Sequence, residues 1–149
     1  MKRKFHAIAG ISSFLLIASF WTSTVVSELF LEQAAVVSVK IAVVYALIAL
    51  IPCMAVTGAT GFSMGGKSLH PIVVGKRRRM PFIAMNGVIV LVPAAIYLSA
   101  KAQAGEFDTV FYAVQGVELI AGAINLILMG LNIRDGWRLS RRHIASPRP

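Results

Sequence analysis

The sequence predicts an all-α membrane protein, a single domain of four transmembrane helices in an up-down-up-down bundle with both termini in the cytoplasm. Of its 149 residues, 57% are hydrophobic and only 14% are charged, whereas about a quarter of an ordinary soluble domain is charged. Four stretches reach the roughly 20 apolar residues that one membrane crossing needs. Short connections separate them, so residues 1–149 form one domain without a separate soluble catalytic domain, and a stand-alone enzyme is not expected.

The first two predicted spans cover residues 5–30 and 39–64. The first follows Met-Lys-Arg-Lys, as a signal peptide would, but its apolar run is longer than the roughly 7 to 15 residues of a signal sequence. We therefore expect it to remain as a membrane helix. The second contains Pro52 near its middle, where a proline removes a backbone hydrogen bond and predicts a kink.

The third and fourth predicted spans cover residues 81–100 and 110–133, and a basic tail, residues 134–149, follows them. Pro81 comes directly after a basic connection and suits the first turn of a helix, where its missing N–H is not needed. Pro93 lies near the middle of the third span and predicts a second kink.

The basic residues fall almost entirely on one side of the predicted bundle. Thirteen of the 15 lie before the first span, in the connection at residues 65–80 or after the fourth span, and only Lys40 and Lys101 lie on the other side. Segments rich in Lys and Arg are retained on the cytoplasmic side of the membrane during insertion. We therefore expect a bacterial-type inner membrane protein whose basic segments contact anionic lipids of the inner leaflet. Because this explains the charge, we expect no nucleic-acid partner.

Residues 61–68 match the phosphate-binding pattern G-x-x-x-x-G-K-S. A working loop of this kind follows a buried strand and opens a helix, whose N–H groups surround the phosphates. Here an apolar helix precedes the pattern, and Leu69, His70 and Pro71 follow it. We interpret the glycines as residues that let the second helix pack closely and end, and we expect no nucleotide site.

Polar residues on two spans predict a polar interior. They recur at alternating steps of three and four residues, which places them on one face of each helix. Polar groups are costly in hydrocarbon, so these faces should turn toward protein, and we expect the stripe of the first span to meet that of the fourth. The candidate site residues are Ser13 and Thr24 on the first span and Gln115, Glu118, Asn125 and Asn132 on the fourth.

Glu118 is the single carboxylate well inside a predicted span. As an isolated acid at this depth, it is expected to bind a proton. That property suits a small proton-coupled transporter or channel. The alternative is a protonated acid that bonds to Gln115, to Asn125 or to a first-span hydroxyl and only holds the helices together.

The three histidines, His6, His70 and His143, lie on the predicted cytoplasmic side. His143 belongs to the basic tail and is expected to be solvated. A b-type haem needs imidazole ligands, small residues for close helix approach and cations near its propionates, and His6 and His70 could reach one such site. The alternative is that both bond to lipid head groups. No Cys or His cluster has the spacing of a zinc site.

These patterns predict where a site lies but not what fills it. The leading hypothesis is a binding or accessory subunit, either of a larger membrane complex or of a homo-oligomer. Its sharpest form is electron transfer through haem b bound by His6 and His70. The alternative is a proton-coupled transporter or channel that uses Glu118.

Overall fold

The structure is a computed structural model that describes residues 2–66 and 69–145, and this part of the chain is helical throughout apart from short connections. Four of the described helical stretches are long and apolar enough to cross a membrane, which indicates a membrane protein and confirms the predicted number of apolar helices. Their candidate spans are Lys4–Phe30, Gln33–Gly65, Pro71–Gln103 and Thr109–Ser140.

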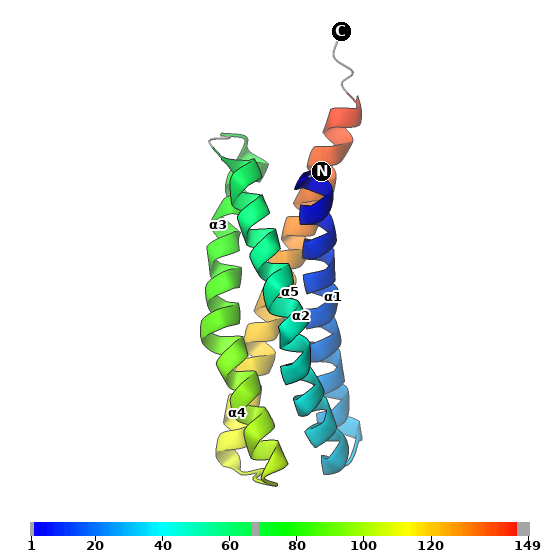
Figure 1. Cartoon of the computed structure of the whole chain (residues 1–149), viewed down its shortest axis with the longest axis vertical. Helices are drawn as coiled ribbons and strands as arrows, with labels where there is room; N and C mark the ends of the chain where they lie inside the picture. Colours follow the sequence, from blue (N-terminus) through cyan, green and yellow to red (C-terminus); the bar gives the residue numbers. More distant parts are fainter. Residues whose placement is uncertain (1, 67–68, 146–149) are drawn as a thin grey trace.

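The helical elements lie alongside one another, as Figure 1 shows. In chain order they are α1 (Lys2–Phe30), α2 (Gln33–Gly65), α3 (Pro71–Met85), the π-helix η1 (Asn86–Leu91), α4 (Val92–Gln103) and α5 (Thr109–Ala145). The first turns of α1 and α3 lie near one end, which we call the basic end because α3 carries the cations of residues 76–79 there. The connections at residues 31–32 and 104–108 lie near the opposite, acidic end, which carries Glu32, Glu106 and Asp108.

Local sequence signals fix several helix ends. Asp108 accepts a hydrogen bond from the Phe111 N–H at 2.8 Å and so caps the first turn of α5. His70 caps α3 in the same way, since its Nδ1 accepts from the Ile72 N–H at 3.3 Å. Gly105, with a φ of 72°, adopts the left-handed conformation that ends α4 and that residues with a Cβ rarely adopt.

The third helix begins at Pro71, so the prediction of a connection over residues 65–80 was wrong. The position of Pro81 in a first turn was also wrong, because Pro71 occupies the first turn and Pro81 lies inside α3. Hydropathy marks the apolar part of a helix, whereas the helix itself extends as long as its backbone and its polar side chains find partners. α5 likewise continues past residue 133 to Ala145, and Asp135 in this stretch pairs with Arg79 of α3.

A π-helix interrupts the third helix just before Pro93. The Val92 N–H donates to the carbonyl of Gly87, five residues back, and Pro93 has no N–H to continue an α-helical ladder. Such a segment takes up one extra residue per turn and is a common cause of helix irregularity. By contrast, α2 continues as an α-helix through Pro52.

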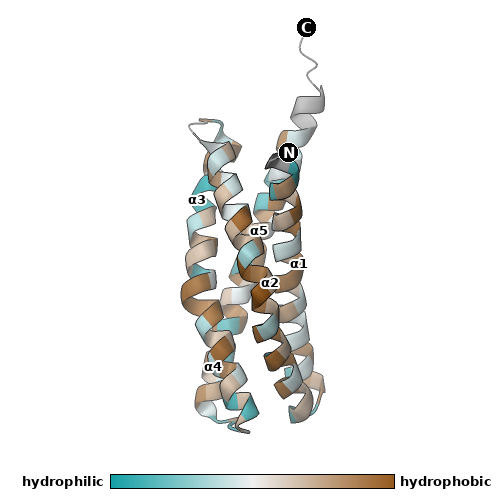
Figure 2. Cartoon of the chain, viewed as in Figure 1, coloured by the Kyte–Doolittle hydropathy of each residue, from teal (hydrophilic) through white to brown (hydrophobic). Residues whose placement is uncertain are grey.

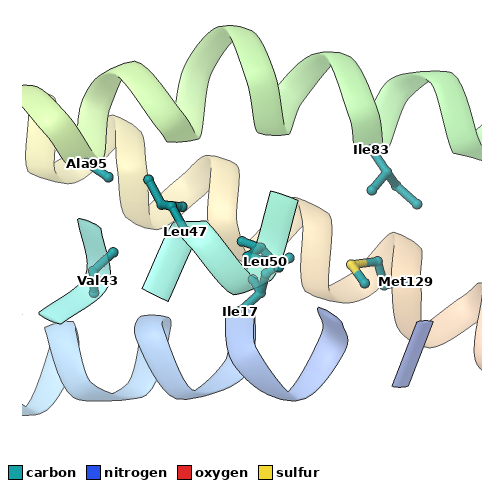
Figure 3. Close-up of a cluster of buried hydrophobic side chains, with 7 residues drawn as sticks. All are labelled: Ile17, Val43, Leu47, Leu50, Ile83, Ala95 and Met129. Carbon is teal, nitrogen blue, oxygen red and sulfur yellow. The ribbon is translucent and has the colours of Figure 1, made fainter. Parts of the chain in front are cut away.

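The core lies between all four long helices. Figure 3 shows its main cluster, formed by Ile17, Val43, Leu47, Leu50, Ile83, Ala95 and Met129. Many large apolar side chains point outward instead, among them Ile48, which is 74% exposed, and Ile120, which is 66% exposed. Figure 2 shows hydrophobic residues recurring along the length of the helices. An apolar exterior of this kind suits lipid better than water.

Candidate functional site

The polar residues predicted on the fourth span lie on one face of α5. Gln115 and Asn125 are buried, and Glu118 and Asn132 are partly buried. Side chains three and four residues apart share a helix face, so these groups form a row along α5. Their partners come from α2, η1 and α3 in turn. The row therefore connects α5 to the other helices at several levels of the bundle.

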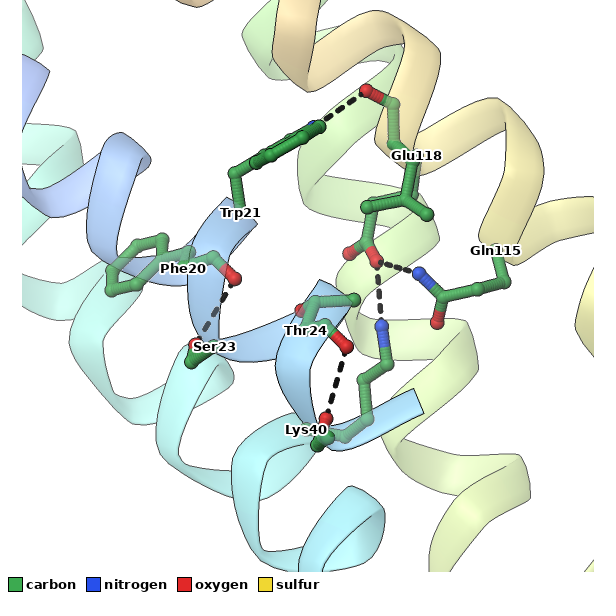
Figure 4. A network of polar contacts seen from close by, with 9 residues as sticks. Phe20, Trp21, Ser23, Thr24, Lys40, Gln115 and Glu118 are labelled. Carbon is green, nitrogen blue, oxygen red and sulfur yellow. Dashed lines mark hydrogen bonds and ion pairs between the residues drawn. The ribbon is translucent and has the colours of Figure 1, made fainter. Parts of the chain in front are cut away.

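Glu118 forms an ion pair with Lys40 of α2 (Figure 4). Nζ of Lys40 lies 2.6 Å from Oε2 of Glu118, and the same oxygen accepts a hydrogen bond from Nε2 of Gln115 at 3.1 Å. The Lys40 side chain is 1% exposed and that of Glu118 is 13% exposed. At 1.5 Å per residue, Lys40 lies roughly 10 Å into α2 and Glu118 roughly 14 Å into α5.

This pair corrects the interpretation of Glu118 as an isolated carboxylate. Lys40 appeared in the sequence as a cation near the surface of the acidic side, because the second span was predicted to begin at residue 39. The helix begins at Gln33 instead, so Lys40 lies inside the apolar part of α2 and reaches α5. The sequence signal that could have found it is the presence of a lone lysine in an apolar run, since such a residue needs a buried partner.

Two buried oxygens beside the ion pair have no hydrogen-bond partner among the described residues. They are Oε1 of Gln115 and Oε1 of Glu28. Glu28, near the end of α1, is close enough to interact electrostatically with both Lys40 and Glu118. One ammonium group is therefore paired with Glu118 and lies within electrostatic range of Glu28, and the set carries one excess negative charge if neither acid is protonated.

A cavity of about 60 Å³ lies beside Glu118. Trp21, Thr24 and Glu118 contribute polar groups to a lining that is otherwise mostly apolar. The indole N–H of Trp21 donates to the carbonyl of Leu119 at 2.9 Å, which fixes the ring against α5. Because one water molecule needs a cavity of roughly 10–15 Å³ by this measure, the cavity has room for water.

Asn125 forms a second contact, near the middle of the bundle. Its Oδ1 accepts from Nδ2 of Asn86 at 2.9 Å, and its own Nδ2 lies 3.4 Å from the carbonyl of Ile83. Nδ2 of Asn86 also lies 2.9 Å from the carbonyl of Ala121. Asn86 begins the π-helix, so this contact ties the irregular part of the third helix to α5.

Asn132 belongs to a third contact, at the basic end. Arg79 donates to Oδ1 of Asn132 at 2.9 Å and to Oδ2 of Asp135 at 2.8 Å. Arg134 lies 3.4 Å from the other oxygen of Asp135. Asp135 is 5% exposed, so a carboxylate that sequence reasoning left in the tail is in fact buried between α3 and α5.

The two candidate residues on α1 lie within the bundle but bond to their own helix. Ser13 is fully buried and donates to the carbonyl of Ala9 at 2.8 Å. Thr24 is also buried and lines the cavity, and its carbonyl accepts from the Ser27 hydroxyl at 3.1 Å. Thr24 is therefore the member of this pair that lies beside Glu118.

His6 lies against α2, with Nδ1 3.1 Å from the carbonyl of Thr57 and 3.0 Å from Oγ1 of Thr60. A carbonyl can only accept, so this contact places the hydrogen on Nδ1 and leaves a lone pair on Nε2 of the neutral ring. A Cβ at Gly61 would lie 3.1 Å from Cε1 of His6 and 3.0 Å from Sδ of Met80. The glycine thus lets α1 and α3 approach α2 closely.

His70 lies in a different environment from His6. Its Nδ1 accepts the Ile72 N–H, which in the neutral ring places the hydrogen on Nε2. His70 precedes α3, so it lies roughly 15 Å along the helix axis from Met80, the α3 residue beside His6. No group of three or more His, Cys, Asp or Glu side chains in the described part of the chain could hold a metal ion, and His143 has no described side chain.

Comparisons with other proteins leave these residues as the basis for assigning function. The chain matches no protein-family description, no curated protein and no solved structure.

Proposed function

We propose that the protein is a small proton-coupled transporter or channel in which Glu118 binds the proton and Lys40 is its counter-ion. The observation that carries the proposal is the acid excess around Lys40. Glu118 pairs with this one buried lysine at 2.6 Å, and Glu28 lies within electrostatic range of it. An uncompensated charge in hydrocarbon costs several kcal/mol, and a bound proton removes that cost.

The partners of Glu118 connect this proton to helix packing. When Glu118 is ionised, Lys40 holds α2 against α5 through the 2.6 Å contact. When the proton moves to Glu118, the Coulomb attraction is lost and Lys40 is left to interact with Glu28. A change in protonation therefore changes which helix Lys40 is held to, α5 or α1, and couples a proton to the arrangement of three helices.

The proposed orientation places this site in the outer half of a bacterial-type inner membrane. The chain crosses four times in up-down-up-down order with both termini in the cytoplasm. The lopsided distribution of basic residues supports this orientation, as does the position of Glu32, Glu106 and Asp108 near the connections at the other end. Reporter fusions after Pro149 should read cytoplasmic, and fusions at residues 31–32 should read periplasmic. The opposite pattern would contradict the orientation.

The proton site can be tested by infrared difference spectra and by proton flux into liposomes. We expect a pH-dependent carboxyl band that Glu118→Gln removes, together with a flux that the same variant abolishes. Glu106→Gln is the matched control, because Glu106 is an exposed acid whose side chain is 61% accessible. Glu118→Gln protein that keeps both signals at equal incorporation would exclude Glu118 as the proton site.

Haem binding by His6 is a second candidate function, favoured by one specific contact. Histidines that ligate metals commonly donate the other ring N–H to a backbone carbonyl, as His6 does to Thr57. This contact leaves Nε2 as the ligating atom, whereas the capping role of His70 does not. A Soret band in the purified protein that His6→Ala removes would support this function. Colourless protein from haem-replete cells would exclude it.

A further inference from the structure

The basic end carries more positive charge than its own acid neutralises. Lys76, Arg79 and Arg134 surround Asp135, and we call these four residues the basic-end cluster. The other five acids of the chain lie at positions 28, 32, 106, 108 and 118, away from this end. Three cations and one carboxylate leave two positive charges unbalanced within the cluster.

Asp135 is already engaged by the two arginines. Arg79 binds one of its oxygens at 2.8 Å, and Arg134 approaches the other at 3.4 Å. The Arg134 side chain is 53% exposed, so a ligand from outside can reach its guanidinium group. The carboxylate is therefore used to hold α3 against α5 and leaves donors of the cluster free for another anion.

Lys76 is the cation that lacks a hydrogen-bond acceptor among the described residues. Its Nζ lies against α5, where a Cβ at Gly136 would be 3.3 Å away. The ammonium group of Lys76 is attracted by Asp135 and repelled by Arg79, and it also interacts electrostatically with His6. An ammonium group has three donors, so a partly buried lysine in this position favours an acceptor that the chain does not supply.

Neighbouring residues place the basic-end cluster at the membrane surface. Trp137, next to Gly136, is 64% exposed, and an exposed tryptophan at the end of an apolar span is typical of the head-group level. Phe82 and Met85 are exposed on α3 and continue from Arg79 toward the apolar middle of the molecule. The hydrogen-bond donors of the basic-end cluster thus lie beside an apolar surface that begins within two helical turns of Arg79.

We propose that the basic-end cluster binds a phosphate group, that of an anionic phospholipid whose acyl chains lie along α3. Guanidinium and ammonium groups together are the side chains that most often bind phosphate oxygens. The exposed apolar residues next to the cluster favour a lipid over a soluble phosphate as the source. This inference depends on neither Glu118 nor the proposed proton site.

The experiment measures thermal unfolding of the full-length detergent-purified protein with added phosphatidylglycerol, phosphatidylcholine or inorganic phosphate. We expect phosphatidylglycerol to raise the midpoint and phosphatidylcholine to leave it unchanged. Lys76→Gln should weaken the apparent lipid affinity about tenfold and keep the lipid-free midpoint of the parent, while Lys76→Arg should retain most of the affinity. Arg78→Gln is the matched control, because it removes the same charge from an exposed position outside the cluster.

Equal losses of lipid affinity in Lys76→Gln and Arg78→Gln would overturn the proposal, since lipid binding would then depend on net charge alone. An equal response to both lipids would also overturn it. A rise with inorganic phosphate alone that Lys76→Gln removes would support a phosphate site and assign its source to a soluble phosphate. Because the Lys76 side chain makes no hydrogen bond between helices in the described part of the chain, we expect the variant to fold.

Discussion

The ion pair of Lys40 with Glu118 and the basic-end cluster differ in both charge balance and depth. The first has two acids for one cation and lies in the apolar part of the bundle, where Lys40 is 1% exposed. The second has three cations for one acid, and Arg79 there is 24% exposed. An excess charge that is deeply buried is best relieved by a proton, whereas an excess near the surface can be relieved by an ion from outside. The same kinds of residue therefore favour different ligands at different depths.

The largest expected effect comes from Lys40→Met, which leaves Glu118 buried without its counter-ion. We expect a loss of about 3–5 kcal/mol in the free energy of unfolding, measured on the detergent-solubilised protein. The double variant Lys40→Met with Glu118→Leu should recover much of this loss, because it removes the unpaired charge. A Lys40→Met protein as stable as its parent would mean that the pair does not stabilise the fold, and the comparison of depths would fail.

Arg79→Gln should have a smaller effect at the basic end. Asp135 keeps Arg134 nearby, and glutamine can still donate one hydrogen bond, so we expect a loss of about 1–3 kcal/mol in the same measurement. Arg78→Gln, at an exposed position, should change stability by less than about 0.5 kcal/mol. A loss at Arg79 as large as that at Lys40 would show that the basic end is as strongly desolvated as the interior.

Gly122→Ala changes the wall of the cavity beside Glu118 without changing the charge there. The new Cβ would lie 3.1 Å from Cδ1 of Trp21, whose ring is fixed by its bond to Leu119, so we expect a loss of about 1 kcal/mol. Gly116→Ala is the control on the same helix, because nothing lies within 4 Å of the Cβ it adds. That change should stabilise the protein by up to about 1 kcal/mol through helix propensity. Equal results for both glycines would mean that Trp21 moves freely.

Asp108→Asn should have the smallest effect, at an exposed pair outside both regions. The ammonium group of Lys101, together with the Phe111 N–H, holds the pKa of Asp108 below its ordinary value. A lowered pKa in the folded state stabilises the fold above the ordinary pKa of about 4, and this contribution is lost as the pH falls through the folded value. We therefore expect the variant to be slightly less stable at neutral pH and equal to the parent in acid. Salt should also remove the difference, because exposed charges are screened. A difference that persists in acid would assign the effect to helix capping.

Hydropathy was sufficient to predict the four apolar helices, but not where the third one begins. Residues 76–79 are four consecutive cations and indicate a connection when only side-chain polarity is considered. They lie inside α3 because one of them, Arg79, finds Asp135 and Asn132 on α5. A partner on another helix decides such a boundary, and local composition does not reveal it.

Periodicity likewise predicted which α5 residues share a face, but not what each one contacts. The steps of three and four residues along α5 follow from helix geometry alone. The pairing of Glu118 with Lys40 joins positions 78 residues apart. It depends on how α2 and α5 are shifted relative to each other along the bundle axis. This relative position cannot be read from the apolar run when a helix begins before it. α2 begins at Gln33, six residues before the predicted start at residue 39.

The π-helix before Pro93 accommodates one extra residue without changing the rotational phase of α4 relative to α3. In a continuous α-helix, one residue more or less turns every later side chain by about 100° around the helix axis. With the π-helix in place, Asn86 reaches α5, and Leu98 and Ala102 enter a core cluster with Val36 and Phe111. Deleting one residue from Asn86–Leu91 would remove the extra residue and let this segment close as an α-helix, which keeps the inner and outer faces of α4 in place. The same deletion at Ile96, inside α4, would instead turn Leu98 and Ala102 by about 100° away from their positions in the core.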